Sequence, residues 1–419
     1  MASSPGDDFL APRRRGGAAL LAALLLAPGS LAARQDDWPT FGGDPGGLRY
    51  STLAQITPAN VATLRPAWTY HMKPSGQARL AAAPEGSDDF GPSLRSDRFL
   101  PSQAPALVAD GKLFLATPYS RVVALDPAGG REIWVHELPP GVRPATRGVE
   151  YWAGDATSPA LVLFGTTDGR LRAIRASDGK PAEHFGEGGS INLRTPDVMV
   201  TGPDKPYSMT SPPIVYQDLV ITGAAVGEAI GGAVGDVRAW DLHTGRHVWT
   251  FHSTPRPGTP GANSWGGDSA RNRSGVNVWG MMTVDVERGI VYMPFGAPAY
   301  DRVGVDRPGD NLFSSSIVAA DARTGRYLWH FQMVRHDIWD LDTQAPPALF
   351  DVKRDGRTIP AVGLINKSNM LFILDRVTGR PLYPIEDRPA PKSDVPGEIT
   401  APTQPFTVKP PPLARMSIS

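Results

Sequence analysis

The side chains best suited to chemistry stand together in the C-terminal half, at residues 335–342 (RHDIWDLD). Three carboxylates and an imidazole within eight residues supply the groups of a general base or of a hard-cation site. A solvated, capped turn is the alternative interpretation of such a run of acidic residues. By itself the segment therefore leaves two hypotheses open, a reactive carboxylate or a surface turn.

Three further positions carry side chains that a ligand could use. Lys367 stands between two strand-like runs, where an ordinary surface lysine is the alternative. Trp279 precedes a glycine, so its ring is either part of the core or a stacking platform. Glu228 lies in the Gly/Ala-rich stretch GAAVGEAIGG, where the backbone can approach a ligand closely. None of these signals is specific alone.

Several classes of function find no support in the sequence. It has no GxxxxGK[ST], HExxH or GxSxG motif, and no GxGxxG between a strand and a helix. The absence of cysteine excludes disulfides, thiolate metal ligands and cysteine nucleophiles. The 42 basic side chains balance the 42 acidic ones, so charge gives no reason to expect a nucleic acid partner.

A repeat shows which elements must position these residues. Each copy is a short apolar run that ends in Asp, a turn that carries Gly, and an aromatic residue eight positions after the Asp. The pattern predicts a β-hairpin whose final aromatic side chain packs between neighbouring sheets. The copies are VVALDPAGGREIW at Asp126, VRAWDLHTGRHVW at Asp241, IVAADARTGRYLW at Asp321 and LFILDRVTGRPLY at Asp375, with a degenerate copy, LRAIRASDGKPAE, at Arg175.

The spacing of the copies favours a β-propeller. Successive copies are 49, 66, 80 and 54 residues apart, which suits blades of several strands each. Glycine and proline, 45 and 43 residues, supply the turns of an all-β chain. Five hairpins are recognisable, and residues 64–68 are expected to close a sixth sheet. A plain sandwich is the alternative, and the Pro-rich stretch after Asp375 is expected to be a long connection rather than a strand.

Residues 1–33 are predicted to be a secretory signal peptide. Three arginines at 13–15 precede an apolar run at 18–27 and a small-residue cleavage site. A transmembrane anchor is the alternative, but ten apolar residues fall short of the roughly 20 that span a bilayer. The mature chain, residues 34–419, is therefore expected to be periplasmic, with no transmembrane span.

Taken together, these features resemble the pyrroloquinoline quinone (PQQ)-dependent dehydrogenases, the propeller quinoproteins that include methanol and membrane-type glucose dehydrogenases. The resemblance rests on residues 38–68, on TRGVEYWAGD at 146–155, on the repeats, on RPGDN at 307–311 and on HDIWDLD. It extends over residues 37–415. It implies a quinoprotein-type eight-bladed β-propeller, of which about five to six blades are recognisable here, so that the propeller is expected to be incomplete and C-terminally truncated.

The resemblance also implies roles for individual residues. Asp340, after the Trp of HDxWD, matches the catalytic carboxylate of the family, and Lys367 matches the basic residue at the quinone oxygens. Lysine at that position is similar to the glucose and polyol dehydrogenase branch. Trp279 matches the floor under the planar cofactor, Arg147 a partner of a cofactor carboxylate, and Thr210 a cofactor hydrogen-bonding position.

A cation site is implied in the same way, with two departures. Glu228 and Asp340 match the family's ligands for Ca²⁺ or another divalent or trivalent cation. The asparagine that helps to bind calcium in the methanol branch is replaced by Ala297, and Asp342 is a candidate to contribute instead. The vicinal cysteine pair of the alcohol branch is absent. The metal is therefore expected to be bound by a modified ligand set.

The function implied is oxidation of an alcohol, polyol or aldose by hydride transfer to PQQ. Because the sequence has no CxxCH haem motif, electrons are expected to leave to a separate acceptor, a quinone or cytochrome c. The competing hypothesis is a non-catalytic propeller scaffold, or an inactive fragment of such an enzyme.

Overall fold

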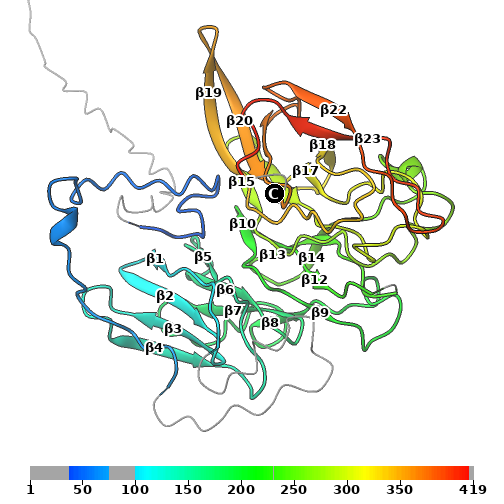
Figure 1. Cartoon of the computed structure of the whole chain (residues 1–419). Helices are drawn as coiled ribbons and strands as arrows, with labels where there is room; N and C mark the ends of the chain where they lie inside the picture. The colour runs from blue at the N-terminus through cyan, green and yellow to red at the C-terminus, as the bar shows by residue number, and fades with distance from the viewer. Residues whose placement is uncertain (1–36, 75–99, 230, 415–419) are drawn as a thin grey trace, which may run out of the picture. The chain divides into compact units, whose positions relative to one another are not determined.

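The computed structural model describes residues 37–74, 100–229 and 231–414, which belong to one compact unit (Figure 1). The expected signal peptide, residues 1–33, lies outside the described residues and stays a prediction. The described helices are two single turns of 3-10 helix, η1 (Val61–Thr63) and η4 (Ala262–Ser264). No helix in the described part of the chain is long and apolar enough to cross a membrane.

Four sheets of four antiparallel strands follow one another along the described chain. Sheet 1 contains β1 (Leu107–Ala109), β2 (Lys112–Thr117), β3 (Arg121–Leu125) and β4 (Glu132–Glu137). Sheet 2 contains β5 (Glu150–Trp152), β6 (Leu161–Gly165), β7 (Arg170–Arg175) and β8 (Ser190–Asn192). Sheet 3 contains β10 (Ile214–Tyr216), β11 (Leu219–Thr222), β13 (Val237–Asp241) and β14 (His247–Phe251). Sheet 4 contains β15 (Thr283–Asp285), β16 (Ile290–Pro294), β17 (Ser316–Asp321) and β18 (Tyr327–Gln332).

A fifth sheet and two strand pairs complete the described strands. Sheet 5 contains β19 (Ala348–Arg354), β20 (Arg357–Ile365) and β21 (Leu371–Asp375). The pairs are β9 (Tyr207–Ser208) with β12 (Ala225–Val226), and β22 (Ile385–Pro389) with β23 (Thr403–Thr407).

The sheets succeed one another as propeller blades do. Within each of the five sheets the strands are adjacent in chain order, and the first strand of each sheet contacts the first strand of the next: β1 with β5, β5 with β10, β10 with β15 and β15 with β19. The predicted all-β architecture is confirmed, and the five sheets fall within the expected range of five to six blades.

An aromatic joint links most neighbouring sheets, as the repeat predicts. At three joints the tryptophan of the repeat, on the last strand of one sheet, covers the turn glycine of the next, so closely that a Cβ on the glycine would lie 2.6 Å from the ring. The indole Nε1 also donates to a backbone carbonyl of that turn. These pairs are Trp134 on Gly179, Trp249 on Gly325 and Trp329 on Gly379.

The degenerate repeat makes its joint differently. Where an aromatic would stand, the chain has Glu183, and Gly245 of the next turn packs instead against the backbone of Gly186. Residues 64–68 form no strand, yet Trp68 covers Gly130 and its Nε1 donates to a turn carbonyl 3.0 Å away. Trp68 therefore makes a joint with sheet 1, whereas the sixth sheet expected at residues 64–68 is not formed by them.

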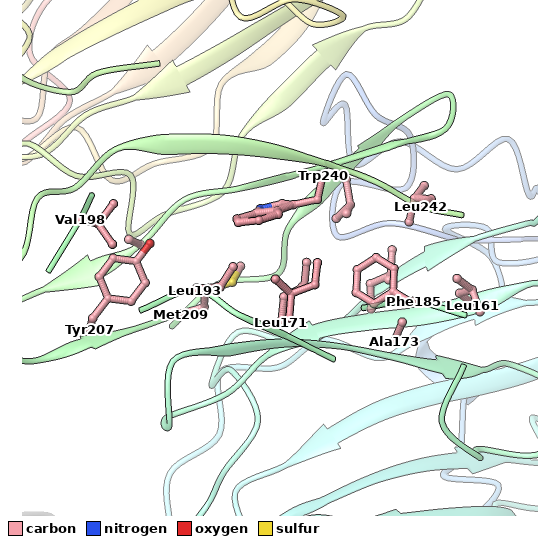
Figure 2. Packing of buried hydrophobic residues seen from close by; sticks show 14 of the residues in the cluster. Leu161, Leu171, Ala173, Phe185, Leu193, Val198, Tyr207, Met209, Trp240 and Leu242 are labelled. Atoms are coloured by element: carbon pink, nitrogen blue, oxygen red, sulfur yellow. The ribbon is translucent and has the colours of Figure 1, made fainter. Parts of the chain in front are cut away.

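Apolar cores fill the spaces between the sheets. The cluster between sheets 2 and 3 contains Leu171 of β7 and Trp240 of β13, which Figure 2 shows with their neighbours. Strands buried on both faces, such as β6, are apolar throughout, because each inner sheet packs against two others.

Two segments outside the repeats also tie sheets together. Residues 38–47 run past the first strands: the Trp38 backbone pairs with β1, and carbonyls of Pro45 and Gly46 accept from β15 and β19. The stretch after Asp375 was expected to be a plain connection, and this is wrong, because β22 and β23 pair within it. Sparse hydrophobic patterning and repeated prolines hide the exposed strand β22 and the largely buried strand β23 in the sequence.

Candidate functional site

The expected site residues come from equivalent places in successive sheets. Arg147, Thr210, Trp279 and Asp340 each stand in the segment that leads into a first strand, β5, β10, β15 and β19 respectively. Lys367 lies in the turn between β20 and β21. Since the first strands contact one another in series, the segments that enter them are brought together although they are far apart in the chain.

Trp279, Arg147 and Thr210 form the first half of the site. The guanidinium of Arg147 lies over the indole of Trp279, with 4.9 Å between its central carbon and the ring centroid. The backbone N–H of Arg147 donates to the carbonyl of Thr210, and the Thr210 hydroxyl donates to the carbonyl of Trp279 at 3.0 Å. Burial lowers the pKa of Arg147, and no described carboxylate is ion-paired with it. A planar ring and a cation are thus held face to face.

Asp340, Lys367 and Asp342 form the second half. The Lys367 ammonium lies 2.7 Å from Oδ1 of Asp340 and 2.8 Å from Oδ2 of Asp342. On the other side, the exposed guanidinium of Arg302 lies 3.6 Å from Oδ2 of Asp340. The Asp340 side chain is 23% exposed, so solvent or a ligand can reach it. Asp340 thus belongs to a charged cluster and not to a bare solvated turn, and its role as a reactive carboxylate stays a prediction.

Gly296 connects the two halves. A Cβ at this position would lie 2.7 Å from Oδ1 of Asp342 and 3.2 Å from Nε1 of Trp279, so the carboxylate and the indole lie on either side of it. Oδ1 of Asp342 also accepts the N–H of Ala297 at 2.6 Å. The position where an asparagine was expected is thus next to a carboxylate supplied by Asp342.

The charges of the second half are mutually dependent. Burial raises the pKa of Asp342, and the nearby Asp340 adds to this, while Lys367 and the N–H of Ala297 act against it. Burial would lower the pKa of Lys367, but its bonds to the two aspartates outweigh burial and raise it. Lys367 is therefore a firmly charged ammonium that holds two carboxylates together.

The predicted cation site is less complete. Glu228 is an exposed residue just after β12, and the contacts described above join the other five predicted residues without it. Among the described residues, no group of three or more His, Cys, Asp or Glu side chains is arranged to hold a metal ion. A cation on Glu228 and Asp340 therefore remains a prediction.

Sequence reasoning missed the layer beneath Asp340. Oδ2 of Asp337 accepts from the hydroxyl of Ser315 at 2.6 Å and from the N–H of Leu341 at 3.0 Å, and its carbonyl accepts from the fully buried Arg307 at 2.6 Å. Burial raises the pKa of Asp337 to about 6. Both residues were visible in the motifs RPGDN and HDIWDLD, but nothing in the local sequence distinguishes a buried charge from a solvated one.

Comparison with known proteins decides the family. Residues 38–419 match the family model described as PQQ: glucose/ethanol/alcohol dehydrogenase, β-propeller domain. The chain belongs to this family. Within the family it is 32% identical over 394 residues to the quinoprotein glucose dehydrogenase of Gluconobacter oxydans, which covers 88% of this chain and 46% of that protein. It is also 32% identical over 401 residues to the glycerol dehydrogenase large subunit of the same organism, covering 92% and 51%.

The solved structures agree. The quinohemoprotein alcohol dehydrogenase of Comamonas testosteroni superposes with a TM-score of 0.69 at 28% identity, over 91% of this chain and 53% of that chain. The chain thus spans about half the length of the relatives that it matches.

The first half of the site fits the family's cofactor. PQQ is a flat, anionic tricarboxylic o-quinone, which needs an aromatic face and a cation at its edge. Trp279 supplies an aromatic ring, and the half-buried guanidinium of Arg147 lies over one of its faces, so a ring and a cation stand next to each other. Thr210 adds a hydroxyl beside them. For the cation, by contrast, the described residues do not form a ligand set.

Proposed function

We propose that this chain is an exported quinoprotein that oxidises the hydroxyl group of an alcohol, polyol or aldose with PQQ as cofactor. The observation that carries the proposal is the triad Asp340–Lys367–Asp342 beside the Trp279–Arg147 pair. A partly exposed carboxylate held by an ammonium, next to an aromatic face, combines a base with a site for a flat anion. The family and its sugar and polyol relatives support the same conclusion.

In this proposal Asp340 is the general base. It takes the proton of the substrate hydroxyl. The hydrogen bound to the carbon that bears this hydroxyl leaves as a hydride, with its electron pair. PQQ, when bound, supplies the two-electron acceptor for that hydride. Lys367 keeps Asp340 oriented and supplies positive charge where reduction adds negative charge. Arg147, Thr210 and Trp279 bind and orient the cofactor, and the partly buried site limits competing water.

The remaining partners follow from the same chemistry. A separate acceptor, a quinone or cytochrome c, would take up the electrons that the cofactor receives when it is bound. The basic and apolar residues 1–33 support export to the periplasm. Glu228 and Asp340 remain the proposed ligands of Ca²⁺ or a similar cation, although no step of the mechanism above depends on it.

The test uses purified chain with added PQQ and Ca²⁺. We expect PQQ to raise the melting temperature and to support dye-linked oxidation of a sugar or polyol. Asp340→Asn should lower kcat by about 10²–10⁴-fold, since it removes the base but little volume. Asp355→Asn is the matched control, because Asp355 lies in the exposed β19–β20 turn.

The outcomes separate the hypotheses. Equal activity in wild type and Asp340→Asn would contradict the role of Asp340. Absence of any PQQ-dependent shift in melting temperature would favour a propeller scaffold without cofactor. Omitting Ca²⁺, or replacing Glu228 by Gln, tests the cation site: unchanged PQQ binding in both cases would remove the cation from the proposal.

A further inference from the structure

A buried polar pair lies behind the loop that carries Asp340. The side chains of His336 and Glu398 are both 2% exposed, and Nε2 of His336 lies 2.8 Å from Oε1 of Glu398. Glu398 comes from the Pro-rich stretch between β22 and β23, far along the chain and without any repeat motif. Nothing in the proposed chemistry uses this pair, so its burial needs another explanation.

Both ring nitrogens of His336 and both carboxylate oxygens of Glu398 have hydrogen-bond partners. Nδ1 of His336 lies 2.8 Å from the carbonyl of Gly309, which can only accept, so Nδ1 carries a proton. The second carboxylate oxygen of Glu398 accepts the N–H of Gly304 at 2.6 Å. Without Glu398, the N–H of Gly304 would lose this acceptor and Nε2 of His336 would lose this partner. Such an unsatisfied buried group is costly.

Both glycines belong to one loop, residues 300–311, which contacts the Asp340 segment directly. The carbonyl of Asp301 accepts the backbone N–H of Asp340 at 3.3 Å, and the backbone N–H of His336 donates to the carbonyl of Asp310 at 3.1 Å. Arg302, whose guanidinium faces Asp340, is on the same loop. The loop is therefore joined to the Asp340 segment at both of its ends.

The middle of this loop packs against His336 and Asp337. Gly304 is so close to the His336 ring that a Cβ would lie 2.6 Å from Nε2. Arg307, fully buried, donates to the carbonyls of Tyr300 and Asp337. Loop 300–311 is thus held by direct contacts both with Glu398 and with residues 336–340.

Asp340 needs such support because of its backbone. Its φ is +58° and that of His336 is +46°, in the left-handed region that is uncommon for residues with a side chain. Two left-handed residues within five positions stay in place only if the surroundings hold them. The hydrogen bonds from loop 300–311 are part of that restraint.

We propose that Glu398 is a positioning residue for Asp340: through His336 and Gly304 it fixes loop 300–311 against residues 336–340, and so holds the carboxylate of Asp340 in its reactive orientation. The proposal rests on the function proposed above for Asp340. It assigns to Glu398 no contact with substrate or cofactor. Replacing Glu398 should therefore change the orientation of the base Asp340 and leave ligand binding unchanged.

The experiment compares Glu398→Ala with Glu398→Gln in the full chain. A glutamine can satisfy the same groups, because its carbonyl can accept the N–H of Gly304 while its amide group faces Nε2 of His336 as a donor. We expect Glu398→Ala to speed amide hydrogen exchange in residues 300–311 and 336–341 by at least about tenfold. Glu398→Gln should stay within about twofold of wild type.

Kinetics provide the second readout. Glu398→Ala should lower kcat roughly ten- to a hundredfold and leave KM within about twofold, since only the orientation of the base changes. Glu398→Gln should restore kcat. The matched control is Glu386→Ala, in the same Pro-rich part of the chain but on the exposed strand β22. If Glu398→Ala does not fold, Glu398→Asp takes its place, because the shorter side chain cannot reach both partners.

The outcomes are distinguishable from those of the proposed function. An exchange rate in Glu398→Ala equal to that of Glu386→Ala would overturn the positioning role, whatever the activity. A rise in KM with kcat unchanged, or a Glu398→Gln variant as impaired as Glu398→Ala, would overturn it too. If the wild type neither binds PQQ nor turns over substrate, the proposed function fails, while the exchange experiment still decides whether Glu398 holds the Asp340 segment.

Discussion

The joints between the sheets and the cluster around Asp340 lie in the same succession of sheets, but opposite kinds of contact hold them. At a joint, one indole ring covers one glycine and donates one hydrogen bond, and the same contact recurs along the chain. Around Asp340, several charged side chains from separate segments are paired over a layer of buried charge. The joints therefore contribute stability by apolar burial, whereas the cluster gives up stability to keep charges in place.

This difference predicts how each region responds to change. Variants at the joints should alter the free energy of unfolding and leave its pH dependence intact. Variants in the charged region should alter the pH dependence of that free energy or the catalytic rate, and should leave the packing at the joints largely unchanged.

The largest loss of stability is expected at a joint. Trp249 is 6% exposed, covers Gly325 and donates to the carbonyl of Ala322. Trp249→Ala should lower the free energy of unfolding by about 3–5 kcal/mol, because it removes a buried indole and leaves a cavity. Urea unfolding measures this, with the exposed neighbour Val248→Ala as control at less than about 0.5 kcal/mol. A loss below about 1 kcal/mol in Trp249→Ala would show that the ring does not hold the joint.

The glycine partner of the same joint gives the next effect. Gly325 has a φ of +71° and a Cβ would lie 2.6 Å from the Trp249 ring, whereas Gly111 has a φ of +68° with nothing within 4 Å. Alanine at either position should cost roughly 1–2 kcal/mol for the left-handed backbone. Gly325→Ala should cost about 1–3 kcal/mol more, for overpacking. Equal losses in the two variants by urea unfolding would mean that the ring moves aside freely.

The charged region should show its effect through pH. Burial raises the pKa of Asp337 to about 6, above the unfolded value of about 3.9. The folded state therefore keeps a proton that the unfolded chain has lost, so the stabilising contribution is present below about pH 4 and is lost as pH rises through about 6. The free energy of unfolding should fall on the order of 2–3 kcal/mol across this window.

Asp337→Asn isolates this contribution, because Glu150 and Asp342 also have raised pKa values and change stability in the same direction. Urea unfolding between pH 4 and pH 7 should give a flatter profile for Asp337→Asn than for wild type. Trp249→Ala should keep the wild-type slope at a lower stability. If the free energy of unfolding varied with pH equally in wild type and Asp337→Asn, groups other than Asp337 would cause the pH dependence.

The smallest effect is expected from a surface charge at a joint. Arg323 of the β17–β18 turn is paired with Asp218 of the β10–β11 turn, and their side chains are 51% and 33% exposed. Arg323→Gln should lower the free energy of unfolding by less than about 1 kcal/mol, and the effect should shrink further in high salt. A double-mutant cycle with Asp218→Asn checks the pair. A coupling well above that value would mean that the joints also depend on charge.

Much of the fold was readable from local sequence, for a physical reason. Each repeat consists of a strand, a turn glycine with positive φ and an aromatic residue eight positions after the Asp. These features depend on neighbouring residues only, so each repeat predicts its own hairpin. Trp134, Trp249 and Trp329 all pack where the pattern predicts. The strands β22 and β23 were not predicted because they are short, contain proline and lack an apolar alternation in their sequences.

The site was readable only in part. The resemblance to quinoproteins named Asp340, Lys367, Trp279, Arg147 and Thr210, and contacts in the structure connect these five residues. That Lys367 binds two aspartates at once, with Asp342 beside Ala297, could not be inferred from spacing. Such a contact depends on how the turn of sheet 5 meets the segment that enters it.

What the sequence alone determined is thus the succession of sheets and a set of candidate site residues, because both depend on short local motifs. What only the tertiary structure decided is which charges are buried and what holds them. Glu398 is a glutamate in a Pro-rich stretch, and by composition it belongs on the surface. It is buried against His336 because two segments some 60 residues apart pack together, and such packing depends on long-range contacts that no local pattern records.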